Sequence, residues 1–324
     1  MKFYVDRFKI SLLLPTLILL MSCTPYPEKL IVGAAPWPNF EFTFLAEQLG
    51  YIDPNEYSLV ELTSSTSVIQ AFQSNKLDVA FVSLDEVLTL AALGVDLKII
   101  SVVDVSFGGD ALMTKPEIKS LDELKWRTIG YENKAAGALL LDKFFSLTGL
   151  NNQTVQLFEI KQNELKNAYL RGNIDALIVR EPVKQQLLAL GARELINSKA
   201  LIAPITHVII AREDSYETQQ DKITIFLKQF YKAHHFYQTN PDNALTIMSV
   251  RLQLYPYLLE NAFENMRFFT AKESLLQLTG TPSNIEEQAH QLSALMVDKY
   301  MLGQVNIDLS SLISSKILEK VVYD

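Results

Sequence analysis

The sequence predicts an α/β protein of two lobes, each a mostly parallel sheet flanked by helices, with a hinge between the lobes and a helical C-terminal tail. Three observations predict this fold class. Apolar runs of strand length alternate with helix-like segments over residues 30–179, a weak internal repeat with an offset of 97 residues runs through this region, and only helical patterns follow residue 211.

The repeat relates three pairs of segments. Residues 31–33, 71–72 and 77–82 correspond to residues 128–130, 168–169 and 174–179. Short strand patterns are degenerate, so chance similarity between two α/β units is the alternative explanation. Two lobes built on one plan predict a cleft between them, and such clefts commonly bind small ligands.

The first group of elements alternates between strand and helix. We expect strands at 30–35, 58–62, 78–84 and 97–105, and helices at 42–49, 68–74 and 87–93. Gly50 and Gly94 end two of the helices, and the Ser/Thr cluster at 63–67 caps another. This order favours a parallel sheet with helices on both faces.

The second group begins after Phe107-Gly108-Gly109-Asp110, which interrupts the alternation. A short strand at 111–114 and a β-α-β-α-β set over 128–179 follow, and 205–211 is another buried strand. We assign residues 23–112 plus 205–324 to lobe 1 and residues 113–204 to lobe 2. The chain then crosses twice between the lobes, and Gly108-Gly109 is suited to act as the hinge. The helices of the tail are expected at 217–239, 241–252, 255–266, 271–278 and 284–303.

Residues 1–22 are typical of a lipoprotein signal peptide. Lys2, Arg7 and Lys9 precede an apolar run that is too short to span a bilayer. Residues 20–23 resemble the bacterial lipobox, which implies lipid attachment (palmitate among the acyl chains) at Cys23 and a place on the periplasmic or extracellular face of the cell envelope. The alternative is a buried cysteine at the end of an apolar segment.

Composition excludes several classes of function. Cys23 is the only cysteine, so the mature chain has no disulfide or thiolate metal site. Loss of residues 1–22 removes three basic residues and one acidic residue and lowers the formal charge from −8 to −10, which disfavours nucleic-acid binding. His234 and His235 are adjacent on a helix and point apart, and His207 lies in an apolar strand typical of a core histidine. We find no dinucleotide, phosphate-loop, zinc-protease or nucleophile-elbow motif, and expect no metal, cofactor or catalytic residue.

Polar and aromatic residues follow the strands, where parallel α/β sheets bind ligands. The candidate ligand-binding residues are Trp37, Asn39, Ser64, Ser65, Thr66, Ser83, Asp85, Asp110, Glu132, Asn133, Arg180 and Glu181. Trp37 is expected to cover the ligand, the hydroxyls to hydrogen-bond it, and Arg180 to meet a negative group. Most have a structural alternative: Trp37 as core, the hydroxyls and Asp85 as helix caps, Arg180 paired with Glu181 or Asp85, Glu181 with Pro182 as a residue that sets the loop path, and Asp110 as the cap of a crossing strand.

Several motifs occur together in the order of one family. They are Ser64-Ser65-Thr66, the segment 77–83, Gly108-Gly109-Asp110-Ala111-Leu112, the segment 119–124, Thr128-Ile129-Gly130 and the segment 173–182. On these the chain resembles the substrate-binding lipoproteins of nitrate/sulfonate/taurine-type ABC transporters, including the binders of thiamine pyrimidine precursors. The resemblance implies a type II periplasmic binding protein-like fold and an ABC permease with its ATPase as partner. Two departures are Lys125-Trp126-Arg127 in place of Lys-Gly-Lys, and Arg180 where an aromatic residue is frequent. The related enzymes carry a cysteine-rich motif that this chain lacks.

The predicted function is therefore that of a lipid-anchored solute-binding protein of an ABC uptake system, acting as a monomer. It would bind a small polar, anionic or zwitterionic organic solute between the lobes. If Asp85, Glu132 and Glu181 face the cleft, they would equally favour an amine, and the solute would then be zwitterionic or cationic. One alternative is a periplasmic ligand-sensing component of a signalling system. A more remote one is an enzyme that acts on a small molecule in the same cleft.

Overall fold

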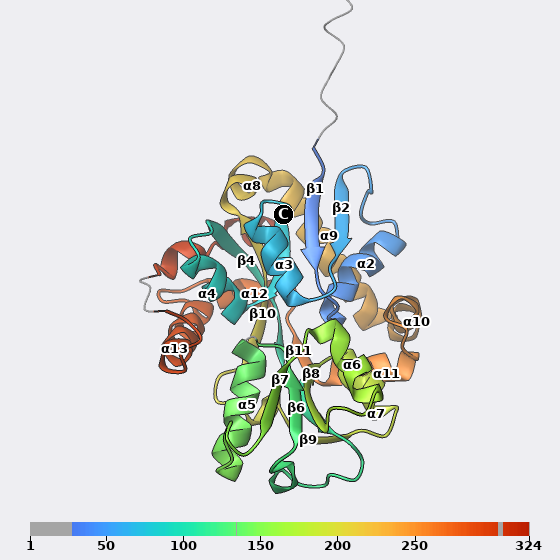
Figure 1. Ribbon diagram of the computed structural model, residues 1–324. Helices are drawn as coiled ribbons and strands as arrows, with labels where there is room; N and C mark the ends of the chain where they lie inside the picture. Colours follow the sequence, from blue (N-terminus) through green and yellow to red (C-terminus); the bar gives the residue numbers. More distant parts are fainter. Residues whose placement is uncertain (1–27, 134, 304–306, 324) are drawn as a thin grey trace, which may run out of the picture.

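The computed structural model describes residues 28–133, 135–303 and 307–323, so the predicted signal peptide and Cys23 lie outside the described residues. The chain forms two lobes, each built on one sheet, which lie above and below each other in Figure 1. Among the described residues, none of the helices combines the length and the apolar character that crossing a membrane requires.

The first sheet has the strand order β11-β4-β10-β3-β1-β2. Its strands are β1 (Leu30–Ala34), β2 (Tyr57–Glu61), β3 (Val79–Ser83), β4 (Leu97–Ser106), β10 (Ile205–Arg212) and β11 (Met266–Phe268). Its helices are α2 (Glu41–Gln48), α3 (Ser65–Gln73), α4 (Leu84–Ala92), α8 (Glu213–Thr218), α9 (Gln220–Thr239), α10 (Pro241–Leu252), α11 (Pro256–Glu264), α12 (Ala271–Leu278), α13 (Asn284–Asp298) and α14 (Lys316–Tyr323).

The second sheet has the strand order β7-β6-β8-β5-β9. Its strands are β5 (Asp110–Thr114), β6 (Thr128–Tyr131), β7 (Gln156–Glu159), β8 (Ala176–Arg180) and β9 (Arg193–Asn197), and its helices are α5 (Ala135–Thr148), α6 (Gln162–Leu170) and α7 (Val183–Leu188). Apolar side chains are buried on both faces of this sheet. Alternate residues of β5 show this, since Leu112 belongs to one core cluster and Ala111 and Met113 belong to the other.

Both sheets are mostly parallel in strand direction. In the first sheet, β10 lies antiparallel between β3 and β4, and β11 is antiparallel to β4. In the second sheet, β5 alone runs against its neighbours β8 and β9. The four strands β1 to β4 therefore share one direction, as the β-α alternation predicts, although β10 separates β4 from β3.

The internal repeat has a structural counterpart. The pairs Val32–Val79 and Gly33–Ala80 join β1 to β3, and the pairs at the same offset, Ile129–Ala176 and Gly130–Leu177, join β6 to β8.

An aspartate before the third strand of each lobe makes the same contact. Asp78 Oδ2 accepts a hydrogen bond from the backbone N–H of Ile31 at 2.7 Å, and Asp175 Oδ2 accepts one from Thr128 at 3.0 Å. The two lobes therefore share a local architecture as well as an order of elements.

Some elements differ from the sequence prediction. The helix predicted to begin at Val87 begins at Leu84, where the Glu86 carboxylate accepts a hydrogen bond from the backbone N–H of Ser83 at 3.0 Å. The helix predicted to reach residue 266 ends at Glu264, because β11 pairs with β4, and the helix predicted to reach 303 ends at Asp298. Strands β9 and β11 and helices α7 and α14 are not in the prediction. The proposed lobe boundary between residues 112 and 113 falls inside β5, a strand of the second sheet.

Candidate functional site

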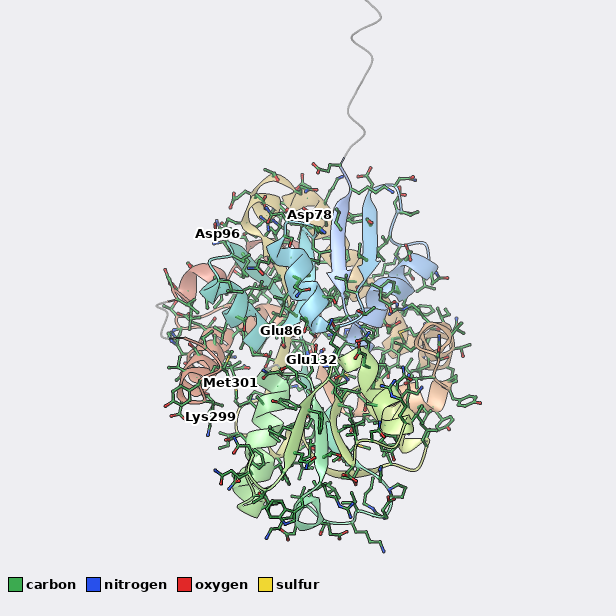
Figure 2. All side chains as sticks on the ribbon, viewed as in Figure 1. Asp78, Glu86, Asp96, Glu132, Lys299 and Met301 are labelled. Carbon is green, nitrogen blue, oxygen red and sulfur yellow. The ribbon has the colours of Figure 1, made fainter. Side chains whose placement is uncertain are left out.

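The two lobes meet where the carboxyl ends of β1, β3 and β8 point toward the centre of the molecule. Glu86 from the first lobe and Glu132 from the second both lie in this region in Figure 2, and they line one small cavity. In a parallel sheet, the loops after the strand ends carry side chains toward one edge. Here two such edges face each other.

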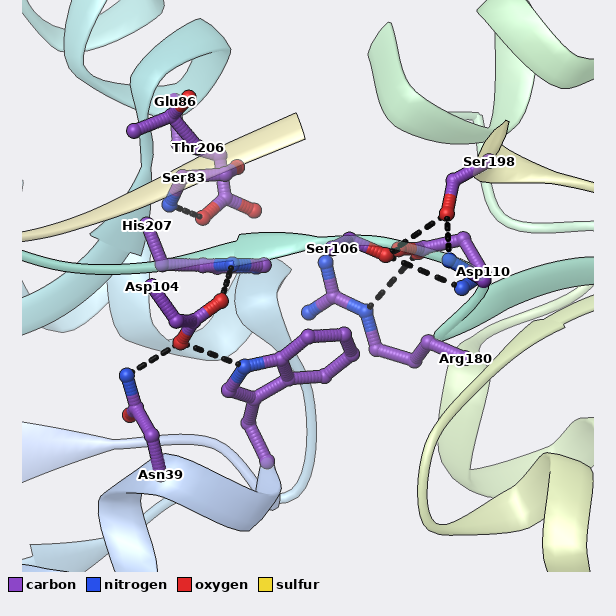
Figure 3. Close-up of polar contacts among 12 residues, drawn as sticks. Asn39, Ser83, Glu86, Asp104, Ser106, Asp110, Arg180, Ser198, Thr206 and His207 are labelled. Atoms are coloured by element: carbon purple, nitrogen blue, oxygen red, sulfur yellow. Dashed lines mark hydrogen bonds and ion pairs between the residues drawn. The ribbon is translucent and has the colours of Figure 1, made fainter. Parts of the chain in front are cut away.

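The floor of the region is a buried group of polar side chains around Asp104, a residue of β4 that is fully buried. Asp104 Oδ2 accepts hydrogen bonds from Trp37 Nε1, at 3.0 Å, and from Asn39 Nδ2. Asp104 Oδ1 lies 2.8 Å from His207 Nδ1 (Figure 3). The imidazole of His207 packs against the Trp37 ring, with a centroid distance of 4.4 Å. One carboxylate thus holds Trp37, Asn39 and His207 in place.

Arg180, at the end of β8, crosses from the second lobe to the first. Its guanidinium lies over the Trp37 ring with 5.1 Å between the guanidinium carbon and the ring centroid. Nη1 donates a hydrogen bond to Ser65 Oγ at 2.8 Å, and Nε lies 3.8 Å from a carboxylate oxygen of Asp110. Arg180 therefore contacts two residues of the first lobe while it remains paired with a carboxylate of its own lobe.

A cavity of about 30 Å³ lies beside this guanidinium. Its charged lining consists of Asp85, Glu86, Asp110, Glu132 and Arg180, and Ser65, Ser83, Ala136, Gly137, Gln162, Ile178 and Val179 complete it. Four carboxyl groups face one guanidinium, so the lining is acidic. Despite these carboxyl groups, the described part of the chain contains no group of residues arranged to hold a metal ion.

A larger cavity of about 230 Å³ lies on the other side of Arg180, between the loops after β1, β2 and β8 and the end of α10. Ser64, Ser65, Arg180 and Glu181 line it, together with Ala35, Pro36, Glu61, Thr63, Gln162, Asn163, Pro182, Val183, Gln186, Arg251, Leu252 and Gln253. Arg180, Ser65 and Gln162 border both cavities. The Arg180 side chain is thus a partition between a small acidic cavity and a larger one.

The chain crossing beside the site is held by polar contacts. Ser106 Oγ donates to Asp110 at 2.7 Å and lies 2.9 Å from Ser198 Oγ, which accepts the Gly108 N–H at 2.7 Å. Gly108 has a φ of +113°, which favours glycine. At Gly109 a side chain would lie only 3.1 Å from the Trp37 ring. The second glycine therefore permits the close approach of the crossing segment to Trp37.

Burial changes the ionisation of the acidic side chains here. Burial, together with the neighbouring charge of Glu86, raises the pKa of Asp85 to about 6. For Arg180, burial by itself would lower the pKa, but Asp110, Glu86 and other carboxylates nearby raise it overall, so the guanidinium stays charged. The electrostatic environment of the site thus favours cations.

Glu181 makes folding stability depend on pH. Burial raises the pKa of Glu181 to about 7, and the hydrogen bond from Gln185 and the charge of Lys184 offset only part of this. Between the unfolded pKa of 4.5 and the folded value, the folded state binds the extra proton, so stability falls as pH rises through this window. Glu181→Gln lacks this titrating group. The stability difference between the variant and wild type should therefore shift in favour of the variant by about 2 to 3 kcal/mol from pH 5 to pH 8.

Urea denaturation at pH 5 and pH 8 measures this effect. Glu117→Gln, at an exposed glutamate of the same lobe, is the matched control and should leave the pH dependence of the wild type unchanged. An equal pH dependence in wild type and Glu181→Gln would contradict the assignment.

Comparisons with known proteins agree with this architecture. The family described as NMT1/THI5 like matches residues 37–244, well over half of the chain. The chain belongs to the NMT1/THI5-like family. Its fold is that of the periplasmic binding proteins, as the sequence predicts: the alkanesulfonate-binding protein SsuA from Xanthomonas axonopodis pv. citri superposes with a TM-score of 0.74 at 15% identity, over 89% of this chain and 99% of that one. The periplasmic aliphatic sulphonate binding protein SsuA from Escherichia coli gives 0.69 at 16% identity, over 89% and 92%.

Two curated relatives are each 24% identical to this NMT1/THI5-like chain. One is a putative aliphatic sulfonates-binding protein of Bacillus subtilis, matched over 64% of this chain and 63% of its own length. The other is a putative thiamine biosynthesis protein of Haemophilus influenzae, matched over 64% of this chain and 68% of its own length. The matched region thus leaves about a third of each relative unaligned.

The predicted ligand-binding residues of this NMT1/THI5-like protein fall into four groups. Ser65, Ser83, Asp85, Asp110, Glu132 and Arg180 line the small cavity, and Ser64, Ser65, Arg180 and Glu181 line the larger one. Thr66, Glu132 and Asn133 line a third cavity. Trp37 and Asn39 are fully buried, and Arg180 lies over the Trp37 ring. In this structure Trp37 therefore packs beneath Arg180 and has no exposed ring face with which to cover a solute.

The sequence prediction lacks several residues of the site. Asp104 organises the floor, Glu86 and Gln162 line the small cavity, and Asn265 donates to Glu181 Oε1 at 3.1 Å. The signal for Asp104 is a carboxylate inside an apolar strand, since a buried charge requires partners. The prediction of His207 as a core histidine agrees with its burial and its contact with Asp104, although Nε2 has no hydrogen-bond partner among the described residues.

Proposed function

We propose that this chain is a lipid-anchored, extracytoplasmic solute-binding protein of an ABC uptake transporter. Its lobes would close on a small organic solute and present it to a membrane permease with its ATPase, while Cys23 anchors it to the membrane. The observation that carries the proposal is the pair of cavities between two similar lobes, bordered by polar side chains from both. Proteins with this arrangement respond to solutes through the difference in affinity between open and closed states.

Contacts between the lobes support closure around a solute. Thr66 Oγ1 of α3 donates to Glu132 Oε1 of the second lobe at 2.7 Å, and Arg180 reaches Ser65 of the same helix. These bonds form at the rim and the wall of the small cavity. A solute that took the place of these contacts would touch both lobes at once, which is the condition for favouring the closed state.

The charges of the site narrow the chemistry of the solute. Four carboxyl groups and one guanidinium line the small cavity, and a purely anionic solute would bring another negative charge beside them. We infer a solute that carries a positively charged group, a zwitterion or a cation. The proposal therefore differs from a simple transfer of sulfonate binding from the Bacillus subtilis relative.

Catalysis is not proposed. The acidic residues of the site surround a guanidinium and hydroxyl groups, and no nucleophile with an adjacent general base is evident among the residues that line the two cavities. A periplasmic sensor would use the same cleft. Genes for a permease and an ATPase beside this gene would support transport, whereas an adjacent kinase or cyclase gene would support sensing.

The direct test begins with native mass spectrometry of the protein purified from its own cells, to identify a bound small molecule. Calorimetry then compares wild type with Glu132→Gln, which removes one negative charge from the cavity. We expect a loss of affinity of about tenfold or more, the scale of a charge-assisted hydrogen bond.

Glu117→Gln, which changes the same charge at an exposed position away from both cavities, should leave the affinity unchanged. Equal affinities for wild type and Glu132→Gln would show that the solute binds elsewhere. A protein that carries no solute from its own cells and binds none in a metabolite panel would contradict the proposed function itself.

A further inference from the structure

The surroundings of the Arg180 guanidinium form a complete binding site for a planar cation. The indole of Trp37 lies beneath it, Ser65 Oγ accepts from Nη1, and Asp110 faces Nε. Its side chain is only 14% exposed. An aromatic face, a hydroxyl acceptor and carboxylates together are the partners that a desolvated guanidinium requires.

The rest of the small cavity continues the same chemistry. Asp85, Glu86 and Glu132 line it, and Arg180 is the only cationic side chain among the described residues that do so. Ser83 is 1% exposed, and its hydroxyl belongs to the same lining. The cavity therefore keeps acidic and hydroxyl groups beyond those that Arg180 uses.

The size of the small cavity excludes an organic solute while Arg180 occupies its present position. Its volume of about 30 Å³ corresponds to the space of roughly one water molecule. The larger cavity, of about 230 Å³, is also bordered by Arg180 and contains the acidic side chains Glu61 and Glu181. A solute that reaches Trp37 and the carboxylates must move Arg180, and the larger cavity offers space for the displaced side chain.

We propose that Arg180, in this conformation, occupies the place of the planar cationic group of the solute (a guanidinium, an amidinium or a protonated aminoheterocycle), and that the solute displaces it. This inference rests on the proposed function and specifies the substrate class of the same site. It assigns Arg180 the role of an internal competitor. In this conformation the side chain also joins the lobes, because it comes from β8 and contacts Trp37 and Ser65 of the other lobe.

An internal competitor has a measurable consequence for affinity. The apparent association constant of a solute equals the intrinsic constant multiplied by the fraction of protein in which the site is free. Removal of the competitor increases this fraction and so raises the apparent affinity. Arg180→Ala should therefore bind a cationic solute about tenfold or more tightly than wild type does. A residue that instead contacts an anionic group of the solute would give the opposite sign.

The test does not depend on knowing the natural solute. Methylguanidinium, a fragment of the arginine side chain, should bind Arg180→Ala, raise its thermal unfolding temperature saturably at millimolar concentration, and reduce its radius of gyration in solution scattering. Wild type should show neither response. Methylammonium at equal ionic strength should have no saturable effect on the variant, since it lacks the planar fork of donors. Arg180→Met, which keeps an apolar stem, replaces the alanine variant if that variant does not fold.

Two outcomes separate this inference from the proposed function. The inference is overturned if a folded Arg180 variant shows no saturable response to methylguanidinium or binds the co-purified solute more weakly than wild type does. Neither result contradicts the proposed solute-binding function. A saturable response in the variant, with tighter binding of the co-purified solute, supports it. Methylguanidinium binding to wild type with equal affinity would also overturn it, because Arg180 would then not compete for the site.

Discussion

Replacement of Asp104 with alanine should lower the free energy of unfolding by about 3 to 5 kcal/mol, the scale of breaking a buried charged group from its partners. Asp104 is fully buried and accepts hydrogen bonds from Trp37 and Asn39, and it contacts His207 Nδ1. The alanine variant leaves these polar groups in a region that water does not reach. Urea denaturation followed by tryptophan fluorescence measures the loss directly.

The same substitution should also disturb the site, because the Trp37 indole beneath Arg180 is held through its Nε1. Asp96→Ala is the matched control: Asp96 is an exposed aspartate just before the same strand, and its loss should change stability by about 0.5 kcal/mol or less. Equal stabilities for Asp104→Ala and the control would refute the claim that Asp104 organises the floor.

Replacement of Arg251 with alanine should destabilise the protein by about 3 kcal/mol, since it leaves a buried carboxylate without its partner. Arg251, on α10, donates from Nε to Glu41 Oε2 at 2.7 Å and also pairs with the exposed Glu61. Glu41, on α2, is fully buried, and burial raises its pKa although Arg251 offsets part of the effect. Without Arg251 the Glu41 pKa rises further, so the destabilisation should be larger at pH 8 than at pH 5.

A second substitution tests this mechanism. Glu41→Gln in the Arg251→Ala background should recover part of the stability, because an amide is less costly to bury than a carboxylate. Arg171→Ala removes an exposed arginine at the end of α6 and should have little effect at either pH. If the double variant is no more stable than Arg251→Ala at pH 8, the unpaired Glu41 charge is not the cause of the loss.

The repeat shows how much of the fold was accessible from local patterns. The offset of 97 residues predicts that residues 31 and 128, and residues 78 and 175, have equivalent places, and the hydrogen bonds from Ile31 to Asp78 and from Thr128 to Asp175 agree with this. Elements of this kind follow from short-range signals, since apolar periodicity and capping residues act within a few positions of each other.

Short elements were harder to predict from the sequence. Strand β11 has three residues and exists through its pairing with β4, about 160 positions earlier in the chain. Its hydrophobic pattern continues that of α11, so the sequence favours a longer helix there. The loss of helical hydrogen bonds is compensated by a tertiary contact that local sequence does not encode.

The residues of the candidate site also divide into those that local patterns predict and those whose place depends on tertiary packing. Ser65, Ser83, Asp85, Asp110, Glu132 and Arg180 were predictable because each follows or ends a strand, or begins one near the crossing, and they do line one cavity. For Trp37 the sequence left two roles open, a cover for the ligand or a core residue, and in this structure Trp37 is buried beneath Arg180. Burial depends on what packs over a side chain, and here that residue lies more than a hundred positions away.

The order of most strands and helices, the two related lobes, the residue types at the strand ends and the acidic charge of the chain can be read from the amino-acid sequence. Folding adds three features that local patterns do not contain: β10 enters between β3 and β4, Asp104 holds three polar side chains, and a guanidinium from one lobe lies on an indole of the other. The physical reason is distance along the chain. Periodicity and capping act between near neighbours, whereas strand insertion, charge burial and contacts between lobes join residues that only the folded chain brings together.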